Sequence, residues 1–214
     1  MAKALILGST GLTGSFVLQK TLESSFFTEV TVWVRKPLTI KHPKLKEHIT
    51  DFKTLPNSNA EIVFSCLGTT KSKTPDPKAY QFIEVSIPVE TAKSISSSVL
   101  KQFHYISSIG TSATGVSSYL KNKWEAESKL SKIGIGSLYI YRPSLIFGER
   151  KDTRILENIS SAIFSVIQPL FFGPIKKYKR INAETIAEAM VKNAINSTAG
   201  KHILESDEIQ NIGG

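Results

Sequence analysis

The chain has very little cysteine: Cys66 is the only one in 214 residues. One thiol cannot form a disulfide within the chain, which excludes a disulfide-rich secreted scaffold and favours a cytoplasmic protein. The first seven residues hold one lysine and an apolar run of only four residues, too short for a secretory signal. The four histidines are scattered without the spacing of a metal site, so we expect no bound metal.

The chain also lacks an apolar run long enough to cross a bilayer. The most apolar stretch, residues 159–174, is short and interrupted by Gln168 and Pro169. Three interpretations of it stay open: a packed helix, a lid over an apolar substrate pocket, or a contact with a membrane surface or a second copy. The neighbouring basic residues 176–180 keep peripheral membrane contact possible. We expect residues 150–182 to form a segment on the substrate side of the domain.

Negative charge is scarce, with 18 Asp and Glu against 27 Lys and Arg and a net charge of +9. The basic residues are spread along the chain and no nucleic-acid-binding motif accompanies them, so nucleic acid is not an expected partner. A basic surface attracts an anionic cofactor, and an acidic protein partner stays open. The composition, 41% hydrophobic and 21% charged, is that of a globular protein, and the length fits one domain.

The rest of the chain is organised around residues 3–14. An apolar run at residues 4–7 predicts a buried strand, and Gly8, Gly11 and Gly14 follow it before a helix-like segment begins. Such glycines let the backbone turn tightly and approach a pyrophosphate, whose charge is held by the N–H groups and dipole of the helix N-terminus. An ordinary strand-to-helix turn that binds nothing is the alternative.

Predicted strands and helices then alternate to the end of the chain. We expect strands at residues 30–34, 47–52, 61–67, 103–106, 137–141 and 202–204, and helices at residues 80–100, 119–130 and 183–195. Pro88 lies inside the first of these helices, where a proline can produce a kink. This alternation predicts an α/β fold: one doubly wound parallel sheet of Rossmann type, spanning residues 1–214, with right-handed crossovers.

The end of the second predicted strand bears on cofactor choice. In dinucleotide folds an Asp or Glu there binds the 2′-hydroxyl of NAD, but this chain has Arg35, followed by Lys36. A guanidinium suits a 2′-phosphate, which favours NADPH over NADH. A surface arginine that binds nothing is the alternative. Asp51 and Phe52, at the end of the third strand, are placed where they could border the adenine.

Tyr119 and Lys123 form the only Tyr-x-x-x-Lys pair in the chain. On a helix they share one face. The reference pKa of tyrosine is about 10, and a lysine one turn away, with an oxidised nicotinamide nearby, would lower it. Tyr119 could then pass a proton to or from a substrate oxygen as hydride moves. The pair follows the predicted strand that ends in Ser107 and Ser108.

At these residues the chain resembles the short-chain dehydrogenase/reductase superfamily. Among its subgroups it is most similar to the small atypical one of Tat-interacting-protein-type oxidoreductases and their bacterial NAD(P)-binding relatives. The motifs that carry the resemblance span nearly the whole chain: LGSTGLTG at residues 7–14, CLGTT at 66–70, the serine pair at 107–108, YLKNK at 119–123 and YRP at 141–143.

The resemblance implies a Rossmann fold that binds NADPH (NADP+) and transfers hydride to or from a carbonyl or alcohol. Ser108, Tyr119 and Lys123 match the catalytic triad, and the Gly-containing turn after Ser108 favours it over Ser107. The resemblance implies cofactor binding by Gly8, Thr10, Gly11, Leu12, Thr13, Gly14, Arg35, Lys36, Asp51, Phe52, Cys66, Leu67, Gly68, Lys123, Arg142, Pro143 and Ser144.

One departure from the superfamily pattern keeps other functions open. Residues 80–100 contain no asparagine, whereas many members carry a catalytic asparagine in that helix to support a proton relay. A non-catalytic module that senses NADPH and binds a protein partner is therefore the main alternative to an oxidoreductase. A peripheral membrane or lipid-handling protein is the third interpretation. The sequence does not indicate the substrate.

Overall fold

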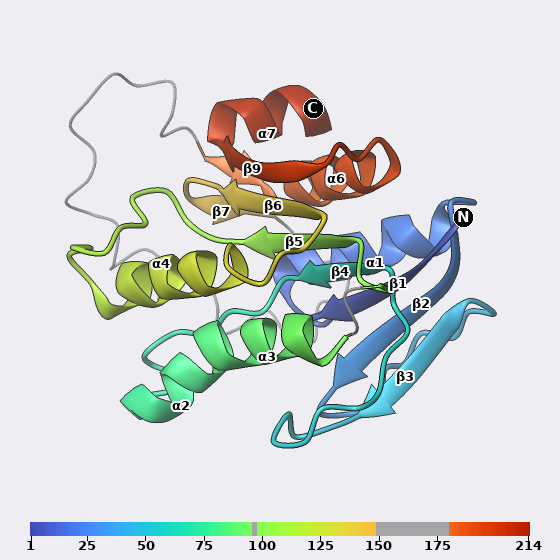
Figure 1. The fold of residues 1–214 in the computed structure, drawn as a ribbon, viewed down its shortest axis with the longest axis horizontal. Helices are drawn as coiled ribbons and strands as arrows, with labels where there is room; N and C mark the ends of the chain where they lie inside the picture. Colours follow the sequence, from blue (N-terminus) through green and yellow to red (C-terminus); the bar gives the residue numbers. More distant parts are fainter. Residues whose placement is uncertain (96–97, 149–179) are drawn as a thin grey trace.

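The computed structural model describes residues 1–95, 98–148 and 180–214. Their centre is a seven-stranded sheet in the order β3-β2-β1-β4-β5-β6-β9, in which every neighbouring pair is parallel (Figure 1). Its strands are β1 (Ala2–Leu7), β2 (Phe27–Val34), β3 (Leu45–Ile49), β4 (Ile62–Ser65), β5 (Gln102–Ile106), β6 (Ser137–Arg142) and β9 (Gly200–Glu205). The predicted doubly wound parallel sheet is confirmed, and the strand order changes direction between β1 and β4.

Helices cover both faces of the sheet (Figure 1). They are α1 (Leu12–Glu23), α2 (Pro77–Gln81), the π-helix η1 (Phe82–Ser86), α3 (Ile87–Ser94), α4 (Ser118–Leu130), α6 (Ala183–Ile195) and α7 (Ser206–Gly213). Successive residues of a strand point to opposite faces. Accordingly Ala4 and Ile6 of β1 pack in the cluster formed with α1 and α6, whereas Leu5 and Leu7 pack in the cluster formed with α3 and α4. Burial on both faces explains why the central strands β1 and β4 are mostly apolar runs.

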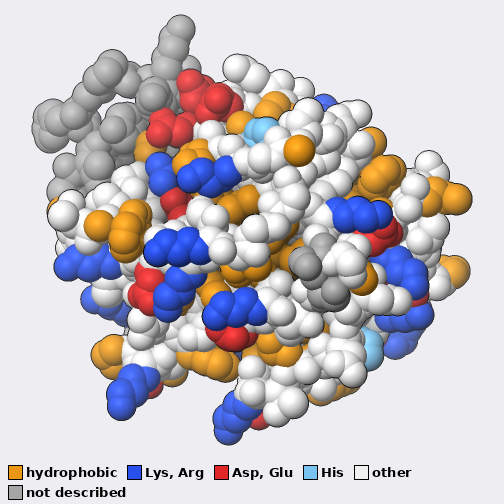
Figure 2. Space-filling view, viewed as in Figure 1, with side chains coloured by type: hydrophobic (Ala, Val, Ile, Leu, Met, Phe, Trp, Pro, Cys, Tyr) orange, Lys and Arg blue, Asp and Glu red, His pale blue; other side chains and the backbone are white. Residues whose placement is uncertain are grey.

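The basic residues are dispersed over the face of the molecule drawn in Figure 2. On the face in view, Figure 2 shows Lys and Arg side chains interspersed with acidic and uncharged ones, not collected in one patch. Several of them pair with carboxylates, such as Lys101 with Glu61 at 2.7 Å and Lys129 with Glu125 at 2.7 Å. The face in view (Figure 2) therefore carries charges of both signs and no single basic patch.

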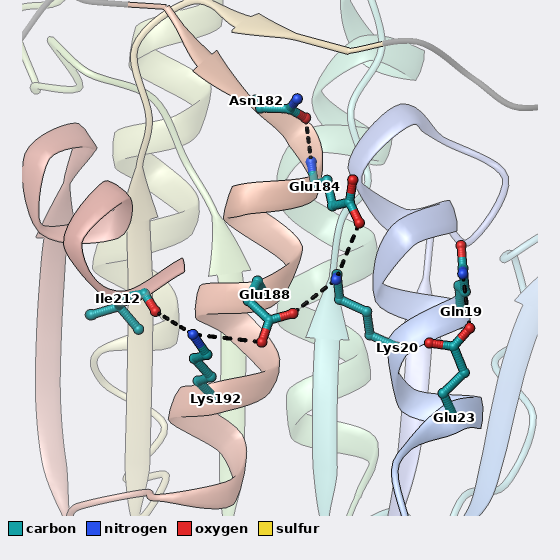
Figure 3. Close-up of polar contacts among 8 residues, drawn as sticks. All are labelled: Gln19, Lys20, Glu23, Asn182, Glu184, Glu188, Lys192 and Ile212. Carbon is teal, nitrogen blue, oxygen red and sulfur yellow. Dashed lines mark hydrogen bonds and ion pairs between the residues drawn. The ribbon is translucent and has the colours of Figure 1, made fainter. Parts of the chain in front are cut away.

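Helix α1, which follows the glycine loop, is tied to α6 by ion pairs (Figure 3). The Nζ atom of Lys20 lies 2.8 Å from the carboxylate of Glu188 and 3.4 Å from that of Glu184. Lys192 of α6 in turn donates to the carbonyl of Ile212 in α7 at 3.1 Å. Solvent-accessible ion pairs of this kind contribute little stability each.

The helix expected over residues 80–100 is different in the structure. It is divided into α2, η1 and α3, and α3 ends at Ser94. Pro88 explains the π-helical turn, because its ring clashes with the carbonyl four residues earlier, that of Glu84. The turn is widened accordingly: the Ile87 N–H bonds to the carbonyl of Phe82, five residues back. Residue 84 is therefore displayed from an irregular turn, as in many functional sites.

Other boundaries also shift. The third strand lies at Leu45–Ile49 and not at residues 47–52, since the backbone leaves the sheet and Phe52 adopts a φ of 65°. The sequence did not predict α7, nor the short parallel pair β7 (Ile146–Phe147) and β8 (Ile181–Asn182). The apolar stretch 159–174 lies outside the described residues, as does most of the segment 150–182 expected on the substrate side.

A buried histidine lies in the middle of the sheet. His104 of β5 is fully buried, with Nδ1 3.0 Å from the Tyr141 hydroxyl and Nε2 3.1 Å from Oε1 of Gln102. Its ring stacks on that of Tyr139, which stacks in turn on His202. Burial, together with the charge of His202, lowers the pKa of His104 to about 3. The folded protein therefore keeps this imidazole neutral through the mildly acidic range.

We expect the free energy of unfolding to fall as the pH falls below about 6.5, the pKa of an exposed histidine. The unfolded chain takes up a proton on His104 that the folded chain does not, so stability is retained above that pKa and lost below it. Between pH 8 and pH 5 the protonation of His104 in the unfolded chain lowers the free energy of unfolding by about 2 kcal/mol. Urea unfolding at both pH values measures it. His104→Gln should reduce the loss by that amount and the exposed His48→Gln should not; an unchanged loss in His104→Gln would contradict the assignment.

Candidate functional site

The predicted site residues converge at one edge of the sheet. Because the strands are parallel, their carboxyl ends meet there, and ligands of such folds bind where the strand order changes direction. The glycine loop follows β1, and Cys66, Leu67 and Gly68 follow β4 beside it. The serines follow β5 and Arg142 ends β6.

The glycine loop is packed so closely that larger residues do not fit. Gly8 has a φ of 79°, and a Cβ added there would lie 2.7 Å from the carbonyl oxygen of Cys66. A Cβ on Gly14 would lie 2.1 Å from the carbonyl oxygen of Gly8. Gly11 is the N-cap of α1, and no side chain caps that helix end. The loop thus brings bare backbone and a helix N-terminus together at the switch point, an arrangement that can hold an anion.

Ser9 adds a polar atom to this loop. The residue is only 3% exposed, and within the described part of the chain its Oγ has no hydrogen-bond partner. A buried hydroxyl without a partner costs free energy unless a ligand or water pairs with it. Together with the glycine backbone and the helix end, it fits the oxygens of a pyrophosphate.

The residues expected near the adenosine lie at the ends of β2 and β3. Arg35 and Lys36 directly follow β2 and are exposed. Asp51 is exposed too, and its Oδ1 accepts from the Lys53 N–H at 2.9 Å. Phe52 is buried among the apolar residues on the α3 and α4 face of the sheet. The structure therefore leaves the two cations accessible next to the strand end, where a 2′-phosphate would be expected.

Tyr119 and Lys123 share one face of α4, as their spacing predicts. The Nζ atom of Lys123 lies 5.8 Å from the ring centroid of Tyr119 and 4.9 Å from that of Tyr105. It donates to the carbonyl of Ile106, at the end of β5, at 2.9 Å. Tyr119 is half-buried and within hydrogen-bonding reach of Ser108. The structure thus brings together the three residues that match the catalytic triad.

The ammonium of Lys123 has a partner that the sequence did not predict. Glu84, from η1, places its Oε2 2.9 Å from Lys123 Nζ, and both side chains are at most 3% exposed. Its Oε1 accepts from the Thr69 N–H at 2.7 Å. The signal that could have revealed it is an acidic residue directly between the apolar residues Ile83 and Val85.

A second missed residue, Glu127 of α4, holds the ends of β5 and β6. Arg142 donates to both of its carboxylate oxygens, from Nε at 3.0 Å and from Nη2 at 2.5 Å. The Ser107 hydroxyl donates to the same carboxylate. Ser107 is thereby tied into the scaffold, while Ser108 lies beside Tyr119. Arg142, expected at the cofactor, directs its guanidinium to Glu127.

The loop after β6 is fixed against the other elements of the site. The carbonyl of Pro143 accepts from the Ile109 N–H at 3.0 Å, and the Ser144 N–H donates to the Ser206 hydroxyl at 2.6 Å. These contacts hold residues 142–144 next to the turn that carries Ser108. Any ligand bound at the carboxyl edge would therefore meet a loop of defined conformation.

The described residues offer neither a membrane-spanning helix nor a metal-binding cluster. None of the helices there is both long enough and apolar enough to span a membrane. The same part of the chain contains no cluster of three or more side chains suited to bind a metal.

The chain was compared with known proteins. No family model matches it. Protein HTATIP2 of Rattus norvegicus is 24% identical over 217 residues, which cover 97% of this chain and 88% of that protein. The mitochondrial protein fmp52 of Aspergillus niger is 25% identical over 220 residues, which cover 98% of this chain and 94% of that protein.

Solved structures share the fold. MoeE5 in complex with UDP-glucose and NAD matches with a TM-score of 0.68 at 19% identity, over 97% of this chain and 79% of that one. A short-chain dehydrogenase/reductase superfamily protein from Agrobacterium tumefaciens with bound NAD matches with a TM-score of 0.70 at 13% identity, over 96% of this chain and 78% of that one. The Rossmann-type architecture expected from the sequence is therefore found in both.

Proposed function

We propose that this chain is an NADPH-dependent oxidoreductase that transfers hydride between the cofactor and a carbonyl or alcohol. The chain resembles the atypical short-chain dehydrogenases/reductases in fold and, over nearly its full length, in sequence. The observation that carries the proposal is the convergence of Ser108, Tyr119 and Lys123 at the same carboxyl edge of the sheet as the glycine loop.

The glycine loop and its neighbours would hold the cofactor. The backbone of residues 8–14 and the Ser9 hydroxyl suit the pyrophosphate, as argued above. Arg35, with Lys36 beside it, would pair with the 2′-phosphate. Residues 66–68 would line the side of the loop that Gly8 contacts. When bound, the nicotinamide supplies or accepts the hydride.

The protein's own groups would handle the proton. In the reductive direction the Tyr119 hydroxyl gives its proton to the carbonyl oxygen, which becomes the hydroxyl of the product as hydride reaches the carbonyl carbon. The Ser108 hydroxyl donates a hydrogen bond to the same oxygen. The ammonium of Lys123 stabilises the phenolate that remains until solvent returns the proton. The oxidative direction uses the same groups in reverse.

The proposal is tested by following NADPH consumption with a panel of aldehydes and ketones, and NADP+ reduction with the matching alcohols. We expect at least one pair to turn over, in both directions, with NADPH used faster than NADH. Binding of NADPH without turnover of any member of the panel would favour the second candidate, an NADPH-sensing module with a protein partner. The absence of an asparagine from residues 80–100, where many superfamily members carry a catalytic one, is the observation that favours that candidate.

A cytoplasmic location belongs to the same proposal and rests on the single cysteine. The fungal relatives are named mitochondrial proteins. Cell fractionation with an antibody to the chain separates the two locations.

A further inference from the structure

The pair formed by Glu84 and Lys123 is the most deeply buried ion pair among the described residues. The Glu84 side chain is fully buried and that of Lys123 is 3% exposed, whereas in the other ion pairs between described residues at least one partner is more than 15% exposed. Charges are costly to bury, and the geometry must be favourable to compensate. A carboxylate in direct contact with the proposed catalytic lysine therefore calls for a functional explanation.

Glu84 is held in place from three sides. Its Oε1 accepts from the Thr69 N–H, in the loop that follows β4, and its Oε2 meets the ammonium of Lys123. Its backbone carbonyl accepts from the Tyr105 hydroxyl at 3.3 Å. The π-helical turn before Pro88 presents the residue in this orientation. The carboxylate is thus fixed between the loop expected at the cofactor and the lysine.

We propose that Glu84 is a positioning residue that offsets the charge of Lys123 and thereby keeps Tyr119 a neutral phenol, ready to donate a proton for carbonyl reduction. This inference rests on the proposed function for its catalytic meaning. The charge coupling between Glu84, Lys123 and Tyr119 is a property of the protein alone and can be measured without turnover.

The electrostatics of the cluster support the proposal. Burial lowers the pKa of Lys123, but the charge of Glu84, the interactions with Tyr105 and Tyr119 and the hydrogen bond to Glu84 together raise it, so that the pKa lies well above its usual value and the ammonium stays charged. The pKa of Tyr119 is raised overall. Burial raises this pKa most, and the charge of Glu84 raises it further. The charge of Lys123 and a hydrogen bond with Ser108 lower it. Lys123 alone would favour the phenolate form of Tyr119. Because Glu84 offsets the charge of Lys123, the neutral phenol is favoured instead.

The other ionisable groups that face this cluster do not add a charge to it near pH 7. Tyr80 of α2 and Tyr105 of β5 interact with Tyr119 or Lys123, and burial raises the pKa of both hydroxyls. Cys66, after β4, also senses Lys123, and burial raises the pKa of its thiol to about 12. All three stay neutral near pH 7, so the charge balance around Tyr119 is set by Glu84 and Lys123.

The proposal gives the two directions of the reaction different pH dependences. Reduction needs the protonated phenol, so its rate stays level until the pH approaches the pKa of Tyr119. Oxidation needs the phenolate, so its rate rises about tenfold per pH unit below that pKa. By raising the pKa of Tyr119, Glu84 favours reduction at neutral pH and slows oxidation there.

The test is the pKa of Tyr119 in the full chain, measured by NMR titration of isotope-labelled tyrosine, with Tyr119→Phe to assign the signal. In Glu84→Gln we expect this pKa to fall by about one unit, the effect of removing one nearby charge. The oxidative rate near pH 7 should then rise about tenfold. Glu84→Asp, which keeps the charge, should retain the pKa of the parent protein. Glu90→Gln, an exposed change on α3 of the same charge, is the matched control.

A pKa of Tyr119 that is unchanged or higher in Glu84→Gln overturns the inference. If that variant does not fold because Lys123 is left unpaired, the double variant Glu84→Gln/Lys123→Met removes both charges. It should leave the pKa of Tyr119 within about half a unit of the parent, because the two effects cancel. A rise of about one unit or more would show that Lys123 acts without compensation. A fall of the pKa in Glu84→Gln, combined with no turnover of any carbonyl, supports the charge coupling and rejects the proposed function.

Discussion

Tyr119→Phe is expected to lower carbonyl reduction by about a hundred- to ten-thousand-fold, the usual contribution of a general acid. The change removes only the hydroxyl, and the ring can keep its place near the ammonium of Lys123. NADPH binding should stay nearly unchanged, because the groups proposed to bind the cofactor are untouched. Initial rates measured with a fixed carbonyl substrate, beside a fluorescence titration with NADPH, separate the two effects.

Tyr80→Phe is the matched control for this experiment. Tyr80 is also buried near the cluster and interacts with Tyr119 and Lys123, but it is not proposed to touch the substrate. We expect this control to keep turnover within a few-fold of the parent. Full activity of Tyr119→Phe would show that another group delivers the proton, and an equal loss in both variants would point to a packing effect.

Arg35→Ala is expected to weaken NADPH binding roughly 10- to 150-fold while leaving NADH binding unchanged. The guanidinium would pair with the 2′-phosphate, which only NADPH carries, so the lost contact is specific to that cofactor. Titrations of the variant with both cofactors at the same ionic strength measure the change in preference.

Lys41→Ala is the control for charge alone. Lys41 is an exposed cation in the segment that follows Arg35, paired with Glu47 at 3.5 Å. Its removal lowers the net charge by the same amount and should change both affinities only slightly. An equal loss for NADPH and NADH in Arg35→Ala would assign the arginine to general attraction and not to the 2′-phosphate.

The sheet could be predicted because its signals are local. Strands buried on both faces must be continuous apolar runs, and α6 was predicted with the bounds Ala183–Ile195 because its apolar residues recur at helical spacing. The expected helix at residues 80–100 failed for a local reason too: the proline was recognised, but not that it would widen the preceding turn into η1. The short β7 and β8 strands pair residues 35 positions apart (Ile146 with Ile181), and no pattern within either one indicates the other.

The same distinction holds for the candidate site. The glycine loop and the pair of Tyr119 and Lys123 are local patterns, so they could be identified from spacing. The role of Glu84 depends on where η1 meets α4 in the fold. Its partner Lys123 lies 39 residues further along the chain. Only the fold determines whether a buried carboxylate meets an ammonium, a backbone N–H or solvent.

We propose that the carboxyl edge of the sheet binds a nicotinamide dinucleotide with preference for NADPH. The most direct test of this proposal is a titration of the purified chain with NADPH and with NADH, followed by cofactor fluorescence. We expect saturable binding of NADPH that is at least about tenfold tighter than that of NADH, as expected for one charge-assisted contact to the 2′-phosphate. Absence of binding by either cofactor would contradict it.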